Sequence, residues 1–240
     1  MRRRLLPLLI LPLLPFHAAR AATLRVLSAG AVEPGLAPAV AKFTQAPVAI
    51  TYATAPQLRA RIQGGEMPDL LVAPVSLIDE LLAAGRLLGS PLVLGRVGIG
   101  VVVRADAAAP DIHNAASLRR AVEDAERVVF NRASTGLAME RIFAAWGIAP
   151  RAVRFATGAE VLQRVLAGSG REIGFAAITE IRMLPGLRYI GPVPPEIQIY
   201  TTYAAAPTPG AGPEAEALLR HLAGADSRSL LDAAGVEAAG

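Results

Sequence analysis

The fold of this chain is decided by residues 48–85, whose sequence is VAITYATAPQLRARIQGGEMPDLLVAPVSLIDELLAAG. Residues 48–52 alternate in polarity and are rich in β-branched side chains, which predicts a strand, and residues 70–72 form a short apolar run typical of a buried strand. Residues 56–63 and 77–84 have the spacing of amphipathic helices. The alternation of strands and helices predicts a parallel sheet with helices on both faces.

The same alternation extends from this stretch towards both ends of the chain. A strand and a helix are predicted before it, and a single long apolar strand is predicted at residues 97–103. A second α/β set follows, with helices at residues 116–122, 137–146 and 159–166 and strands at residues 127–130, 153–155 and 173–177. A late strand at residues 197–204 and two helices close the chain.

Two α/β sets that are joined by one strand, with another strand returning late, predict two lobes that the chain crosses twice. Residues 22–98 and 198–240 are expected to form lobe 1, and residues 99–197 lobe 2. The predicted fold class is α/β, with a mostly parallel sheet flanked by helices in each lobe. Open sheets of this kind bind ligands beyond the carboxyl ends of their strands, so we expect a ligand cleft at the hinge between the lobes.

The first 21 residues predict export from the cytoplasm. Arg2, Arg3 and Arg4 precede an uncharged apolar run at residues 5–16, and small residues follow near Ala21. This order is typical of a secretory signal peptide. The run is too short for a membrane-spanning helix, which needs about 20 residues. We therefore expect a signal peptide at residues 1–21 and a periplasmic mature protein.

The mature chain is electrically neutral and contains no cysteine. Removal of residues 1–21 takes away four arginines and no acidic residue, which leaves 20 basic residues against 20 acidic ones. Because the charges are also scattered, no nucleic-acid-binding surface is predicted. Without cysteine the chain forms no disulfide, has no thiol nucleophile and has no cysteine ligand for a metal or a lipid anchor.

Two loops between a predicted strand and a predicted helix could bind an anion. Residues 28–31 are small, so their backbone amides could face a ligand at a helix N-terminus. In residues 131–136, Ser134 or Thr135 could cap the next helix, and Arg132 could pair with a negative group. The alternative for both loops is an ordinary tight turn or helix cap that binds no ligand.

The sequence contains no pattern that predicts catalysis or a cofactor. Neither a GxSxG nucleophile elbow nor a phosphate-binding P-loop is found. The glycines of residues 95–100 precede an apolar strand, whereas a dinucleotide-binding loop opens a helix. His113 and His221 lack a second ligand at metal spacing. We therefore expect no enzyme activity, no metal and no cofactor.

Three stretches carry a resemblance to a known family. LRVLSAGAVEPGLAPAVAKF at residues 24–43, residues 50–87 and EIGFAAITEI at residues 172–181 resemble the periplasmic molybdate/tungstate-binding proteins of ABC importers. The most specific piece is ARIQGGEMPDLLVAP, residues 60–74. The resemblance spans about residues 24–236. It implies a type II periplasmic binding protein fold that closes around a ligand, with a small anion as the ligand, an ABC permease as the partner and a monomeric state.

The resemblance also implies which residues hold the ligand. Members of the family bind a tetrahedral oxyanion with hydroxyls and backbone amides from several loops. This chain has Ala31 where a serine is usual, Pro56 within a usual run of serines, and Ala177 where a tyrosine is usual. The ligand is therefore either a molybdate-like oxyanion or another small anion, such as a carboxylate held by Arg132. The predicted ligand-binding residues are Ala29, Gly30, Ala31, Thr54, Ala55, Arg132, Ser134, Thr135, Gly136, Glu160, Val161 and Thr179.

The predicted function is that of a periplasmic solute-binding protein that delivers a small anion to an ABC permease. A periplasmic ligand sensor on the same fold is an alternative that the residues do not separate from it. A hydrolase is disfavoured because the sequence has no nucleophile elbow, no cysteine and no clustered histidines.

Overall fold

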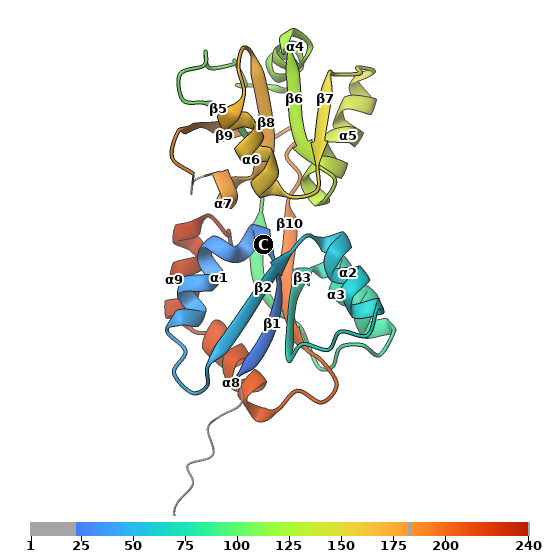
Figure 1. Ribbon diagram of the computed structural model, residues 1–240, viewed down its shortest axis with the longest axis vertical. Helices are drawn as coiled ribbons and strands as arrows, with labels where there is room; N and C mark the ends of the chain where they lie inside the picture. Colours follow the sequence, from blue (N-terminus) through green and yellow to red (C-terminus); the bar gives the residue numbers. More distant parts are fainter. Residues whose placement is uncertain (1–22, 182–183, 240) are drawn as a thin grey trace, which may run out of the picture.

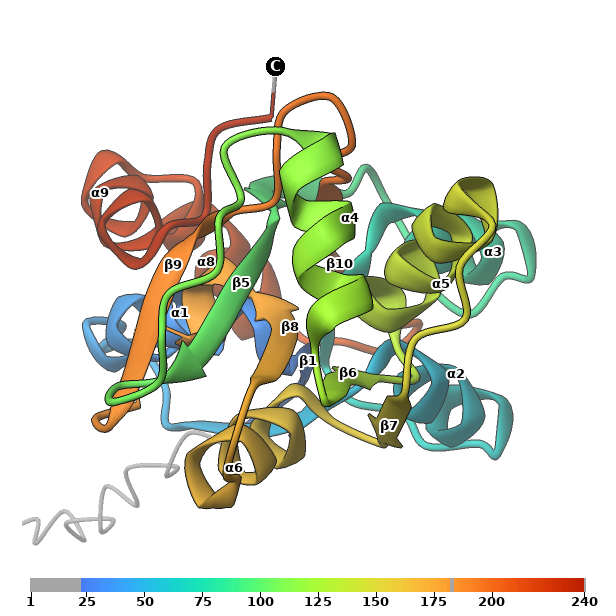
Figure 2. The same ribbon diagram turned by 90° about the horizontal axis from the view of Figure 1, so that it is seen from above.

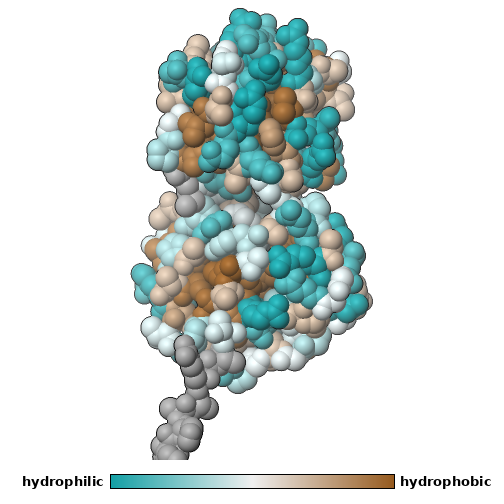
Figure 3. Space-filling view, in the orientation of Figure 1, coloured by the Kyte–Doolittle hydropathy of each residue, from teal (hydrophilic) through white to brown (hydrophobic). Residues whose placement is uncertain are grey.

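The computed structural model describes residues 23–181 and 184–239, and the predicted signal peptide, residues 1–21, lies outside the described residues. Two lobes are stacked along the long axis of the molecule, and each contains one five-stranded sheet (Figure 1). The predicted α/β fold with two lobes is confirmed. The space-filling view shows a narrow waist between the lobes (Figure 3).

Lobe 1 is built on a sheet with the strand order β2-β1-β3-β10-β4. Strand β1 pairs in parallel with β2 and β3, which places Val26 beside Ile50 and Leu70, and β10 lies antiparallel between β3 and β4. Four of the five described strands therefore run in one direction. The elements are β1 Leu24–Ala29, η1 Gly30–Val32, α1 Glu33–Ala41, β2 Val48–Ala53, α2 Ala55–Gln63, β3 Leu70–Pro74, α3 Val75–Ala83, β4 Leu92–Val97, β10 Thr201–Pro207, α8 Pro213–Leu222 and α9 Ala225–Ala234.

Lobe 2 repeats this arrangement with the strand order β7-β6-β8-β5-β9. Strand β6 pairs in parallel with β7 and β8, and β5 lies antiparallel between β8 and β9. The antiparallel strand of each sheet, β10 in lobe 1 and β5 in lobe 2, is the first strand after the chain crosses from the other lobe. The elements are β5 Ile99–Arg104, α4 Ala115–Asp124, β6 Arg127–Asn131, α5 Ser134–Trp146, β7 Ala152–Phe155, α6 Gly158–Ala167, β8 Glu172–Ala177, α7 Ile178–Ile181 and β9 Leu187–Pro192.

The single long strand predicted at residues 97–103 is wrong, because the structure divides it between the two sheets. Strand β4 ends at Val97 and β5 begins at Ile99, with Gly98 between them. The side chain of Gln198, on the returning segment, fixes this crossing: its Oε1 accepts from Ile99 N at 2.9 Å and its Nε2 donates to Ile99 O at 2.9 Å. Residues 97–103 therefore contribute to the hydrophobic cores of both lobes, and hydrophobic periodicity alone does not show where the chain crosses between them.

Two strands at sheet edges were not predicted. Strand β4 begins at Leu92, and β9 includes Gly191 and Pro192. Each of these strands has one partner in its sheet and contains a glycine with positive φ, Gly95 at 140° and Gly191 at 158°. An edge strand that is bent by glycine shows no regular alternation of buried and exposed residues.

Helices cover both faces of each sheet. In lobe 1, α1, α8 and α9 lie on one side and α2 and α3 on the other (Figure 1). Viewed from above, α4 and α5 lie on one side of the lobe 2 sheet and α6 on the other (Figure 2). None of the helices in residues 23–181 and 184–239 combines the length and the apolar character that crossing a membrane requires.

Candidate functional site

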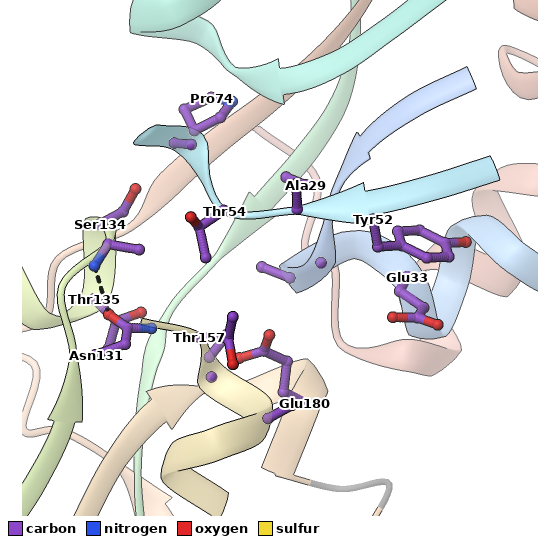
Figure 4. A pocket seen from close by; sticks show the side chains of 18 of the residues that line it. Ala29, Glu33, Tyr52, Thr54, Pro74, Asn131, Ser134, Thr135, Thr157 and Glu180 are labelled. Carbon is purple, nitrogen blue, oxygen red and sulfur yellow. Dashed lines mark hydrogen bonds between the residues drawn. The ribbon is translucent and has the colours of Figure 1, made fainter. Parts of the chain in front are cut away.

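A cavity of about 210 Å³ lies between the lobes (Figure 4). Lobe 1 contributes the loops that follow β1, β2 and β3, together with Tyr203 of β10, and lobe 2 contributes the loops that follow β6, β7 and β8. These six loops all follow the carboxyl ends of strands, where α/β sheets bind ligands. The site therefore belongs to both lobes and is complete only when they face each other.

Seven of the predicted ligand-binding residues line this cavity. They come from three loops that are far apart in the sequence: Ala29, Gly30 and Ala31 after β1, Thr54 and Ala55 after β2, and Ser134 and Thr135 after β6. The loop at residues 28–31 and the loop at residues 131–136 thus reach one cavity from opposite lobes.

The other five predicted residues lie outside the lining. Arg132, which was expected to pair with an anion, has an exposed side chain, although its neighbours Asn131 and Ala133 line the cavity. Glu160 is exposed, and its carboxylate accepts from Thr157 N at 2.9 Å. The Val161 amide donates to Thr157 O at 3.3 Å within α6. Gly136 donates its amide to Asn131 Oδ1, and Thr179 donates its hydroxyl to Ala31 O, so each of them contacts a residue of the lining.

The side chain of Asn131 binds backbone amides at the start of α5. Its buried side-chain Oδ1 accepts hydrogen bonds from Ala133 N and Gly136 N, both at 3.0 Å. Since Asn131 satisfies these two amides, the amides of Ser134 and Thr135 are left at the helix start, where no intrahelical acceptor exists. Their hydroxyls line the cavity beside them. This turn is suited to bind an anion.

The first turn of α6 begins with a capping box. Thr157 Oγ1 accepts from Glu160 N at 3.2 Å, and Glu160 Oε2 accepts from Thr157 N. Gly158 and Ala159 line the cavity at the start of this helix. A Cβ at Gly158 would lie 2.1 Å from Glu180 Oε2, so a larger residue here would force the Glu180 side chain to move. Glu180 therefore packs directly on the backbone of this turn.

Lobe 1 presents two further helix starts. Thr54 is the N-cap of α2, and its amide and hydroxyl both donate to Gln57 Oε1, at 2.9 and 3.0 Å. The loop of Gly30 and Ala31 leads through η1 into α1. Four helix starts from two lobes thus surround one cavity. Each carries partial positive charge, which favours an anion between them.

Two carboxyl groups also line the cavity, Glu33 from α1 and Glu180 from α7. Figure 4 shows the Glu180 carboxyl beside Thr157, with Glu33 and Tyr52 together at the other end. Burial raises the pKa of Glu180 from 4.5 to about 7, a hydrogen bond from the Ala177 backbone opposes the rise, and nearby Glu33 adds to it. Burial also raises the pKa of Glu33. The Glu180 carboxyl is therefore partly protonated near neutral pH.

Two tyrosines complete the polar lining. Burial, and then the charge of Glu33, raises the pKa of Tyr52 to about 12. Its hydroxyl is buried without a hydrogen-bond partner among the described residues. Burial, followed by the charge of Glu180, raises the pKa of Tyr203 above its usual range. Both tyrosines therefore remain neutral, and each can donate a hydrogen bond.

Thr179 connects the two lobes at the edge of the site. Its Oγ1 donates to Ala31 O at 2.6 Å, so a side chain of α7 is bound to the loop that follows β1. Thr179 is fully buried and its hydroxyl hydrogen is used by this bond. It therefore holds the lobes together beside Glu180.

The residues that line the described cavity include no lysine, arginine or histidine. Within residues 23–181 and 184–239 there is also no cluster of three or more His, Asp or Glu side chains with the geometry of a metal site. Among these lining residues, the partial positive charge that could attract an anion is therefore that of the backbone amides at the helix starts.

Sequence reasoning missed several lining residues, most importantly Glu33, Tyr52, Asn131, Thr157, Gly158, Glu180 and Tyr203. A signal existed for Thr157, because the spacing from Thr157 to Glu160 is that of a capping box after a strand. Asn131 also stands between a strand and a helix, where asparagine often bonds the backbone. Nothing local marks Glu180, whose position depends on the meeting of the lobes.

Comparisons with known proteins agree with the fold. A periplasmic molybdate-binding protein from Azotobacter vinelandii has a TM-score of 0.73 and 19% identity, with 90% of this chain and 100% of that chain covered. A tungstate ABC transporter protein from Geobacter sulfurreducens has a TM-score of 0.68 and 12% identity, with 88% and 98% covered. The expected resemblance to molybdate- and tungstate-binding proteins is thus confirmed at the level of the fold.

A relative similar over nearly its whole length is the aconitate isomerase of Pseudomonas sp, which is 29% identical over 249 residues, covering 95% of this chain and 93% of that protein. The family model described as bacterial extracellular solute-binding protein matches residues 24–237, which include both sheets and every loop that lines the cavity. The chain therefore belongs to the family of bacterial extracellular solute-binding proteins.

Proposed function

We propose that this protein binds a small carboxylate in the cleft between its lobes and delivers it, in the periplasm, to an ABC permease. The observation that carries this proposal is the convergence of the first turns of α2, α5 and α6 and of the loop before α1 on one cavity. Backbone amides at helix starts are a common way to hold an anion without a cationic side chain. Membership of an extracellular solute-binding family supports export and a ligand-carrying role.

The chemistry of the cavity favours a carboxylate over a tetrahedral oxyanion. Ala31 offers no hydroxyl, and Pro56, at the start of α2, has no amide hydrogen. A di- or tricarboxylate can reach helix starts in both lobes.

Delivery to a permease requires that the bound and free forms differ in shape. Closure of the lobes around the ligand would present both lobes together to the permease. The two crossings, at Gly98 and at the segment containing Gln198, are the places where a hinge motion is expected. We expect the binding unit to be a monomer, since the cavity is built from a single chain.

Replacing both Ser134 and Thr135 with alanine is expected to raise the Kd for a small carboxylate by at least tenfold. Each hydrogen bond to a charged ligand contributes about 1.5–3 kcal/mol. Calorimetry with di- and tricarboxylates, molybdate and tungstate measures the affinities. The matched control is Arg132→Ala, which should leave Kd within about twofold, because the Arg132 side chain is exposed outside the lining.

Two results would contradict this site. Binding of molybdate or tungstate without any carboxylate would assign the cleft to oxyanions. A strong loss of affinity in Arg132→Ala, with little loss in the double variant, would restore the role that the sequence suggested for Arg132.

A second candidate function is the isomerisation of a bound unsaturated carboxylate. The aconitate isomerase relative covers nearly the whole chain, and the cavity holds a carboxyl group, that of Glu180, with a pKa of about 7. Such a group exists in both protonation states near neutral pH, as a general acid–base catalyst requires. The prediction that the chain is not an enzyme stays a prediction.

The chemistry needs only one proton to move. Ionised Glu180 would take a proton from a carbon next to the C=C bond of the ligand. The C–H electron pair would form a new C=C bond to the neighbouring carbon while the original double bond opens. Protonated Glu180 would then return the proton to the far carbon of this three-carbon unit. No oxidant or reductant is consumed, and the helix starts would stabilise the charge that grows on the ligand carboxylate.

Incubation with cis- or trans-aconitate in D₂O, followed by proton NMR, tests this second function. The wild type is expected to interconvert the isomers and to exchange deuterium into them. Glu180→Gln should slow both by about 10²–10⁴-fold, the usual contribution of a general base. The matched control Glu196→Gln removes an exposed carboxylate outside the lining and should react as the wild type does. If the wild type binds these compounds but neither converts nor labels them, the isomerase function is excluded.

A further inference from the structure

The Glu180 carboxyl occupies the space between helix starts of opposite lobes. A Cβ built on Gly158, in the first turn of α6, would lie 2.1 Å from Glu180 Oε2, and one built on Gly30, in η1, would lie 3.6 Å from Oε1. These turns belong to lobe 2 and lobe 1 and present the amides that an anion would need. A carboxyl of the protein itself thus stands beside the position of the ligand charge.

Among residues 23–181 and 184–239, no cation lines the cavity beside Glu180. The described titratable groups that interact electrostatically with Glu180 are Glu33 of α1 and Tyr203 of β10, and Tyr52 of β2 lines the cavity beside Glu33. On the other sides of Glu180, α6 and η1 contribute the uncharged backbone of Gly158 and Gly30. The described lining contains no arginine, lysine or histidine. A bound anion would therefore repel an ionised Glu180 at short range and low solvent exposure.

Protonation reverses this interaction. A neutral carboxyl is an O–H donor, and a hydrogen bond between it and a ligand carboxylate is charge-assisted and strong. Glu180 packs against the first turn of α6 and lines the cavity, so its carboxyl can reach a ligand bound there. The same group would discriminate against a ligand that offers only donors.

We propose that Glu180 is the specificity-determining residue of the cleft, an inference that rests on the proposed function. In the complex it carries a proton taken from solution and donates its O–H to a carboxylate oxygen of the ligand, so that binding takes up one proton. The ligand class follows from this bond: small carboxylates are accepted, whereas amines, which would pair with an ionised Glu180, would release a proton on binding.

Two consequences can be measured. Above the pKa of the free site, which burial places near 7, the Kd of a carboxylate should rise about tenfold for each pH unit. Glutamine at this position is a permanent N–H donor of similar shape, so Glu180→Gln should bind the same ligand with a Kd that is independent of pH.

The test is calorimetry of the ligand-free protein with the di- and tricarboxylate panel at pH 8, in two buffers that differ in ionisation enthalpy. The wild type should take up close to one proton per ligand, and its Kd should rise about tenfold between pH 7.5 and pH 8.5. Glu180→Gln should show neither effect. Glu196→Gln, at an exposed position outside the lining, should behave as the wild type does.

Infrared difference spectroscopy gives a measurement that needs no variant, since a protonated carboxyl should appear when the ligand is added at pH 8. Carboxylate binding without proton uptake, or with proton release, would overturn the role of Glu180 and leave the proposed function standing. Failure of every carboxylate to bind wild type and Glu180→Gln between pH 5.5 and pH 8.5 would overturn the proposed function itself.

Discussion

Replacing Gly136 with alanine is expected to destabilise the protein by about 3 kcal/mol or more. A Cβ at this position would lie 1.6 Å from Asn131 O and 2.6 Å from the Asn131 carbonyl carbon. Both atoms belong to the backbone, so relief requires moving the end of β6 away from α5. The better helix propensity of alanine, worth about 1 kcal/mol, is much smaller than this cost.

Denaturation by urea, or thermal unfolding, measures the effect; for a chain of this length, 3 kcal/mol corresponds to roughly 6–12 °C in Tm. Gly212→Ala is the matched control, because a Cβ there would meet only the mobile end of the Glu214 side chain, and its cost should stay under about 1 kcal/mol. Equal stability of Gly136→Ala and the wild type would show that the Asn131 turn is not packed as described.

Raising the pH from 5 to 8 is expected to lower the free energy of unfolding of the ligand-free protein by about 3 kcal/mol through Glu180. Its pKa is about 7 in the folded state against 4.5 for an unperturbed glutamate, and each pKa unit corresponds to about 1.4 kcal/mol. Because the folded-state pKa is the higher one, the contribution is fully present below pH 4.5. It is lost as the pH rises through 7. Glu33, whose pKa is also raised by burial, acts in the same direction.

Carboxyl groups whose pKa values are lowered do not act in this pH window. The pKa values of Glu66 and Glu80 are lowered by hydrogen bonds from Arg61 and Arg59, so these groups lose their contribution only as the solution becomes more acidic. Urea denaturation of the wild type and Glu180→Gln at pH 5, 6, 7 and 8 isolates the effect of Glu180. The slope of stability against pH should be markedly smaller in the variant. Parallel curves for the two proteins would contradict a raised pKa at Glu180.

Gly136 and Glu180 have opposite effects on the stability of the protein. Gly136 is needed for the packing of the first turn of α5 against β6, whereas an ionised Glu180 costs stability at neutral pH. A group that destabilises the ligand-free protein and faces the ligand cavity is expected to act on the ligand. The measured cost of Glu180 and its effect on binding should therefore be considered together.

The alternation of strands and helices was predictable from residues 48–85, and the structure confirms it. Strands β1, β3, β6 and β8 carry dense apolar runs because they lie inside their sheets. The edge strand β2 is marked instead by its β-branched residues. The edge strands β4 and β9 were missed, since glycine bends both and neither shows a regular pattern of burial.

The candidate site was predictable where it is made of backbone. Small residues after a strand and before a helix indicated the turns at Gly30 and Ser134, because that pattern is set by local conformation. Arg132 was selected by its charge, but its direction depends on the turn that Asn131 organises, and the side chain is exposed.

The sequence by itself determined the two α/β lobes, their order along the chain and the turns at Gly30 and Ser134 that line the cavity, because periodicity and turn chemistry are local properties. Only the tertiary structure decided that Glu180 and Glu33 share one cavity with no lysine, arginine or histidine in its described lining. The two residues are far apart in the sequence, and they meet because α7 of one lobe packs against η1 and α1 of the other. The raised pKa of Glu180 follows from that meeting, since burial is a property of the assembled lobes and of no single segment.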